Sequence, residues 1–463
     1  MDDLPSEQTS LLSAHPKSRT RRTPLPWGQL FILFWIQLAE PLTSMVIYPF
    51  INKMVSDLPI TGGDEAKMGY YAGLIESLFS VAQAMTVLYW SRLSDRIGRK
   101  PVILIGLLGL TLSMGLFGVS TTFNRCLSGA LNGNTGVIKS MMGEITDDTN
   151  VAQAMALMPV VWNTGATVGP VIGGWLSNPH EQFPGIFPGE FWASYPYALP
   201  CFVVAIYCAG TLIITIFYLE EVSSLKLHNP ANGALESGTT DPHAQLTLYQ
   251  VLTPYVRIAV INYTILAFLD IALRALQPLF LTASPSAGGL GFSVPAVGTC
   301  LAAFFVASGV YQAVAFAPMW EWLGSKKIYV ISMGMFVPIF ALFPMMRASI
   351  GEGSALNAIT WVELALQIIL YVIMDMGFSS ALIYIRASSP NARSLGATNG
   401  LAQTAVAIAR AIGPVFSTSL FALSMEYNIL GGGFVYVVFI AVSVGAVMSA
   451  KRMPERPRND DSE

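Results

Sequence analysis

The stretch WSRLSDRIGRKPVIL, residues 90–104, places a cluster of charged side chains directly before a long apolar run. Its charged residues are Arg92, Asp95, Arg96, Arg99 and Lys100. The whole chain of 463 residues is 53% hydrophobic and only 11% charged, whereas soluble domains carry about 25% charged residues. The stretch therefore indicates a short charged turn between two apolar segments of a membrane protein.

Apolar runs of about 20 residues recur along the chain, and each can cross a bilayer core of roughly 30 Å as a helix. We predict twelve spans, at residues 28–50, 69–90, 101–121, 124–143, 155–177, 196–219, 255–281, 296–318, 328–346, 359–385, 397–424 and 433–450. The expected fold is therefore an all-α membrane protein.

The longest polar interval, residues 220–253, is rich in Gly, Pro, Ser and Asn, which is typical of a linker. It divides the spans into two six-helix bundles, at 27–219 and 254–450. The polar tails 1–26 and 451–463 are predicted to be disordered.

Lys and Arg set the expected orientation. KSRTRR (17–22), the turn at 91–100 and KRMPERPR (451–458) all fall on one side of a twelve-span alternation. The positive-inside rule then places both termini and the linker in the cytosol. Trp27 and Trp192 are typical of aromatic side chains at a membrane interface.

The two bundles also resemble each other in sequence, which predicts a pseudo-symmetric pair. GATVGPVIGG (165–174) aligns with ARAIGPVFST (409–418), so that Gly-Pro pairs coincide. The charged turn aligns more weakly with WEWLGSKKIYVI (320–331), so that Gly98 corresponds to Gly324.

Residues 91–100 read Ser-x-x-x-Asp-Arg-x-Gly-Arg-Lys, which resembles the loop between the second and third helices of the major facilitator superfamily. Residues 165–174 resemble the fifth-helix motif of its drug:proton antiporter branch, and RCLSGALNGNTG (125–136) resembles the fourth-helix motif. AEPL, LNGN and GEITDDTN are similar to a fungal and plant subgroup that includes the zinc-induced facilitator-like transporters.

The resemblance implies roles for two groups of residues. The loop would hold the two bundles together on the cytosolic side, with Asp95 accepting charge-assisted hydrogen bonds; alternatively, its basic residues only set the topology. Its residues are Ser91, Asp95, Arg96, Gly98, Arg99 and Lys100. The fifth-helix motif would seal the substrate path, or would only allow close helix packing. Its residues are Gly165, Gly169, Pro170, Gly173 and Gly174.

Ionisable residues inside a membrane span are costly, so each is a functional candidate. Asp270 and Arg274 are spaced i,i+4 and are expected to pair. Glu40 and Asp270, in the first helix of each bundle, are the main candidates for proton coupling, against the alternative of structural ion pairs. The full candidate set for proton coupling and the substrate cavity is Glu40, Glu76, Arg125, Asn132, Asn134, Asp270, Arg274 and Asp375.

These features favour a secondary active transporter that moves a small organic solute against protons by alternating access. The alternatives are a facilitator or importer and a non-transporting membrane sensor. The chain has no GxxxxGK[ST] phosphate loop, and its four His and four Cys form no metal-binding pattern, so neither an enzyme, a metal site nor a cofactor is expected. The net charge of −3 gives no sign of nucleic-acid binding, and we expect a monomer in the bilayer.

Two further features concern location and completeness. EQTSLL (7–12) fits an acidic dileucine sorting pattern, which favours the vacuolar membrane over the plasma membrane. GVSTTFNRCLSG (118–129) leaves hardly any turn between the third and fourth spans. Either this hairpin is truncated or the sequence lacks a short segment, which puts proton coupling through Arg125 in doubt.

Overall fold

The computed structural model describes residues 24–57, 69–78, 81, 93, 97–119, 141, 145, 151–221, 251–350, 357–390 and 395–454. Before the predicted linker it contains α1 (Trp27–Met45), α2 (Ile51–Ser56), a helical segment at 69–78, α4 (Arg99–Gly118), α7 (Val151–Trp175), α8 (Pro179–Gln182), α9 (Glu190–Ser194) and α10 (Ala198–Tyr218). After the linker it contains α12 (Pro254–Thr282), η3 (Pro285–Ala287), α13 (Val294–Val314), α14 (Phe316–Ile350), α15 (Ala358–Ser388), α16 (Leu395–Glu426), η5 (Ile429–Gly432) and α17 (Phe434–Lys451).

The described residues confirm an all-helical membrane protein. Eight of their helices are long and apolar enough to cross a bilayer, namely α4, α10 and α12 to α17. The predicted spans at 69–90 and 124–143 lie largely outside the described residues, so the prediction of twelve spans is not tested here.

Three segments show more detail than the predicted spans. The predicted span 28–50 ends as α1 at Met45, and a turn leads into α2. α14 consists of two helices that meet at a kink at Gly324, where φ is 74°, and the predicted span 328–346 lies in the second of them. The interval 178–195, predicted to be a loop, contains α8 and α9.

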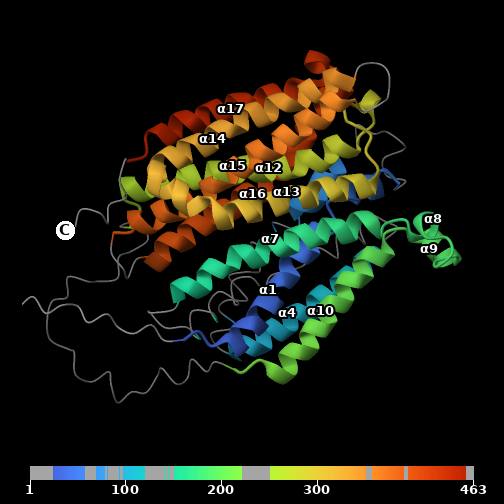
Figure 1. The fold of residues 1–463 in the computed structure, drawn as a ribbon, viewed down its shortest axis with the longest axis horizontal. Coiled ribbons are helices and arrows are strands. Elements are labelled where there is room, and N and C mark those ends of the chain that lie inside the picture. The colour runs from blue at the N-terminus through green and yellow to red at the C-terminus, as the bar shows by residue number, and fades with distance from the viewer. Residues whose placement is uncertain are drawn as a thin grey trace, which may run out of the picture.

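The helices form two groups whose axes diverge (Figure 1). The first group contains α1, α4, α7 and α10, and the second contains α12 to α17. The groups lie together at the end of the bundle where α8 and α9 project, which we call the distal end. They spread apart toward the opposite end, where α1 begins and α17 ends, which we call the terminal end. Contacts between the groups include α7 with α13 and segment 69–78 with α16.

Glycines make the closest helix contacts. A Cβ atom at Gly173 in α7 would overlap the carbonyl oxygen of Val46, which follows α1. A Cβ at Gly174 would lie 3.0 Å from the Cα of Gly298 in α13. The fifth-helix motif therefore packs within its own bundle and across to the other one, because small residues allow backbones to approach.

The internal repeat predicted from the sequence is visible in the backbone. Gly98 has φ 101° and ψ 164°, and Gly324 has φ 74° and ψ 161°, a conformation that favours glycine. Gly169 packs on Met45 at the end of α1, and Gly413 packs on Ile271 of α12. The equivalent glycines thus occupy equivalent places in the two halves.

We predict that Gly298→Ala destabilises the protein by about 1–3 kcal/mol, the usual cost of overpacking. The added methyl group would overlap the carbonyl oxygen of Pro170 and lie 2.9 Å from the Cα of Gly174. Gly109→Ala in α4 is the matched control, because nothing lies within 4 Å of its Cβ position. That change should be neutral or stabilising by up to about 1 kcal/mol. Thermal unfolding in detergent checks both, and equal effects of the two substitutions would contradict the packing described here.

Candidate functional site

Ionisable side chains gather where the two groups of helices meet. Asp270 and Arg274 come from α12, Asp375 comes from α15, and Glu76 comes from segment 69–78 of the other group. Tyr48, in the turn between α1 and α2, lies beside Glu76. Residues from both halves of the chain therefore contribute to one polar group within an apolar bundle.

Arg274 is held by an ion pair and two aromatic rings. Its Nε donates to Asp270 Oδ2 at 2.8 Å, which confirms the predicted i,i+4 pair. Its guanidinium carbon lies 5.3 Å from the centroid of the Phe305 ring and 5.8 Å from that of Tyr371. The Tyr371 hydroxyl donates to the other oxygen of Asp270 at 3.1 Å. These contacts compensate part of the cost of removing both charges from water.

The other two carboxylates have hydroxyl partners instead of cations. The hydroxyl of Tyr48 donates to Glu76 Oε1, and Ser308 in α13 donates to Asp375 Oδ2 at 2.5 Å. Within the described part of the chain, neither carboxylate has a basic group at ion-pair distance. Both side chains are partly buried. An ionised carboxylate that is removed from water without a cation is costly, so both groups are suited to carrying a proton.

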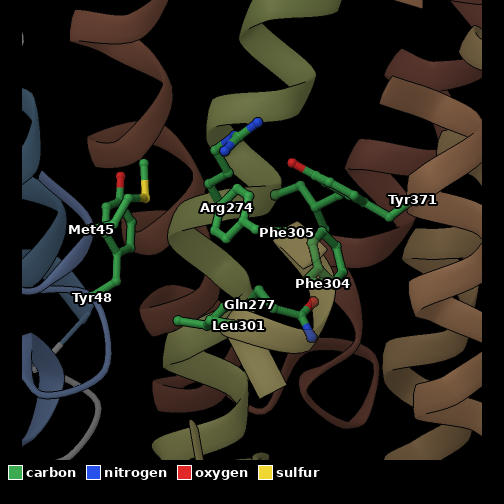
Figure 2. Close-up of a pocket in the computed structure, with 9 residues that line it drawn as sticks. Met45, Tyr48, Arg274, Gln277, Leu301, Phe304, Phe305 and Tyr371 are labelled. Carbon is green, nitrogen blue, oxygen red and sulfur yellow. The ribbon is translucent and has the colours of Figure 1, made fainter. Parts of the chain in front are cut away.

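A small pocket opens beside Arg274. Figure 2 shows Arg274 between Tyr48 on one side and Tyr371 on the other. The lining is mostly apolar and aromatic, with residues Met45, Tyr48, Leu273, Arg274, Gln277, Leu301, Phe304, Phe305 and Tyr371. Apolar walls with a few polar groups are the usual character of a small-molecule site.

Gln277 gives the pocket one further polar contact. Its Nε2 donates to Gln367 Oε1 in α15 at 2.9 Å. Its own carbonyl oxygen is buried and has no hydrogen-bond donor among the described residues. A buried acceptor without a donor is costly, so this oxygen is available to a donor group of a bound solute.

Glu40 lies apart from this group. It is half-buried in α1, where Gln37 Nε2 donates to its carboxylate at 3.2 Å, and it does not line the pocket. Its role in proton coupling stays a prediction. Three other candidates, Arg125, Asn132 and Asn134, lie outside the described residues.

The charged turn is described only at its end, since Ser91, Asp95 and Arg96 lie outside the described residues. The backbone N–H groups of Arg99 and Lys100 donate to the Glu221 carboxylate at 2.7 and 2.9 Å. An anion stabilises a helix N-terminus, so Glu221 caps α4 and ties the start of the predicted linker to this bundle. This contact was not predicted from the sequence.

Tyr48, Ser308 and Tyr371, which donate to the carboxylates, were also not predicted from the sequence. Hydroxyl side chains are common in apolar spans, and no spacing marked these three. They could have been found only by knowing that they lie beside the carboxylate-bearing helices, and the sequence does not show which helices are neighbours.

We predict that Asp270→Asn destabilises the protein by about 3–5 kcal/mol, because it leaves the buried Arg274 without a counter-ion. Arg274→Met in the same chain should recover most of that loss, because the double variant contains no unpaired charge. Thermal unfolding of the two single variants and the double variant gives the coupling energy. Additive effects of the two substitutions would show that the pair contributes no coupling.

The sequence and the fold both match known transporters. Residues 33–269 match the Major Facilitator Superfamily. The chain is 29% identical to the major facilitator-type transporter psiT2 of Psilocybe cyanescens, over 98% of this chain and 97% of the relative. It is 28% identical to the efflux pump azaK of Aspergillus niger, over 93% and 88% of the two chains. It is 26% identical to the protein ZINC INDUCED FACILITATOR 1 of Arabidopsis thaliana, over 93% and 92%.

Solved structures with the same fold include a D-xylose-proton symporter, at a TM-score of 0.72, 14% identity, and coverage of 93% of this chain and 98% of the symporter. The human organic anion transporter MFSD10 matches at a TM-score of 0.62 and 19% identity, over 92% of this chain and all of the other. The helical fold, the pocket between two halves and the match over half of the sequence lead to one conclusion: the chain belongs to the Major Facilitator Superfamily.

Proposed function

We propose that this transporter exchanges a small organic solute for protons by alternating access, with twelve membrane helices in two six-helix bundles. The observation that carries the proposal is the pair of carboxylates, Glu76 and Asp375, one in each half of the chain. Each has a hydroxyl donor and no cation at ion-pair distance among the described residues, and both lie near the pocket beside Arg274. Asp270, in contrast, forms an ion pair with Arg274.

The contact between the halves supports a coupling between the protonation of Glu76 and the opening of the distal end. Segment 69–78, which carries Glu76, packs on α16, and Ser77 Oγ accepts from the backbone N–H of Val415 at 3.1 Å. Separation of the halves at the distal end would break this contact and admit water to Glu76. The neutral form of Glu76 is therefore expected in the closed distal state and the ionised form in the open one.

We propose export or sequestration as the direction of transport, which is supported by the relative that is named as an efflux pump. We assign the terminal end to the cytosol, because α17 ends there with the basic residues Lys451 and Arg452. The dileucine pattern at 7–12 is the support for a vacuolar membrane. The expected acting unit is a monomer with a small molecule and protons as its ligands.

We predict that Glu76→Gln and Asp375→Asn each reduce solute-driven proton flux to roughly a tenth of the wild-type rate or less, a loss of at least about 1.4 kcal/mol in coupling. The test uses proteoliposomes with an internal pH dye and gradients of lipophilic cations, organic acids and neutral drugs. Exchange of labelled for unlabelled solute should continue, because it needs no net proton movement.

Glu190→Gln is the matched control, since this glutamate is exposed at the distal end in α9. It should leave proton flux unchanged. Solute movement without proton flux in the wild type would favour a facilitator, and no movement of any solute would favour a sensor. Normal proton flux in both pocket variants would contradict the assignment of Glu76 and Asp375.

A further inference from the structure

The segment between α7 and α10 contains an ordered aromatic cluster outside the helix bundle. Trp192 contacts Phe187 and Phe191 with ring centroids 5.0 and 5.1 Å apart, and Phe191 contacts Tyr195 at 5.0 Å. None of these four rings belongs to the hydrophobic core that runs through the described helices. The cluster projects from the distal end with α8 and α9 (Figure 1).

Backbone and side-chain hydrogen bonds close this segment on itself. The N–H of Asn178 donates to the carbonyl of Pro196 at 2.8 Å, which joins its two ends. Gln182 Nε2 donates to the carbonyl of Ser177 at 2.9 Å, and Asn178 adopts a left-handed conformation with φ 52°. The rings are therefore presented by a defined loop whose ends meet at the bundle.

The segment exposes both apolar and acidic side chains. Ile186 is 72% exposed and Phe191 is 43% exposed, and Pro184 and Pro188 are also exposed. Glu181 and Glu190 are exposed as well. Large apolar side chains around an ordered aromatic cluster mark a contact surface, and aromatic residues are enriched where a membrane meets water.

The cluster is continuous with the lipid-facing side of the bundle. Phe191 stacks on Phe202 of α10, with centroids 6.4 Å apart and ring planes 12° apart. Phe202 begins a stripe along α10 at helical spacing that continues through Ile206, Ile213 and Phe217, of which Ile206 and Phe217 are 71% and 75% exposed. In a membrane protein, such an exposed apolar stripe faces acyl chains.

From these contacts we propose that residues 183–195 form an interfacial anchor, with Ile186 and Phe191 inserted at the boundary between lipid headgroups and acyl chains of the distal leaflet. The occupant of this surface is the lipid itself, because the surface extends the lipid-facing stripe of α10. Glu181 lies on the water side of the anchor. The anchor fixes the distal ends of α7 and α10 relative to the bilayer, and this role does not depend on proton coupling.

The test places a solvatochromic fluorescent amino acid at position 186 or at position 181 in the full chain, reconstituted in phosphatidylcholine vesicles. The native cysteines are unchanged in this design. We expect Ile186 replaced by the probe to give blue-shifted emission, quenched by lipids with a nitroxide near the headgroup and protected from iodide. The probe in place of Glu181 should be quenched by iodide and not by the nitroxide lipids.

Equal iodide quenching at both positions would overturn the proposal. Protection at 186 that disappears when the protein is diluted in lipid would overturn it as well, because a second copy of the chain would then be covering the surface. Circular dichroism of both labelled proteins confirms folding. As a second measurement, Ile186→Glu in the unlabelled chain should increase hydrogen exchange of the amides in 183–195, while Glu181→Gln should leave it unchanged.

Discussion

A charged side chain inside a bilayer needs a counter-charge or polar partner. In the second helix group, the helices are arranged so that Arg274 has such partners. Asp270 lies one helical turn before it and forms the ion pair at 2.8 Å. Phe305 from α13 and the ring of Tyr371 from α15 pack against the guanidinium, so three helices must converge on one side chain. The pocket exists beside this convergence and takes its aromatic lining from the same residues.

The second constraint is close backbone approach. Gly174 and Gly298 let α7 and α13 meet at the distal end, and the glycines of segment 69–78 let it meet α16. At this end the two halves are in contact, while the helix axes diverge toward the terminal end (Figure 1). Small residues make this contact, together with hydrogen bonds that include those from Val415 N–H to Ser77 Oγ and from Trp175 Nε1 to Thr299 Oγ1. Such a contact suits an interface that opens and closes.

The sequence predicted well those features that follow from local spacing. Asp270 and Arg274 pair because i and i+4 share a helix face. Gly98 and Gly324 share a positive φ because each begins the corresponding helix of its half. It did not predict contacts between distant residues, such as Tyr48 with Glu76, Ser308 with Asp375 and Arg99 with Glu221, which are 28, 67 and 122 residues apart. Those contacts depend on which helices pack together, and hydrophobic runs carry no information about helix neighbours.

Neutral Glu76 and Asp375 are proposed to favour the closed distal end. The most direct measurement is the distance between spin labels at Glu181 and Tyr427, both exposed at the distal end, as a function of pH in lipid nanodiscs. Tyr48, Ser308, Arg274 and Asp270 surround the two carboxylates and remain unchanged in this experiment. Under this proposal, acidification increases the population of molecules with a short distance between the two labels. The Glu76→Gln, Asp375→Asn double variant keeps the short distance at every pH. Distances that respond to pH equally in the wild type and the double variant, or that lengthen on acidification, would contradict it.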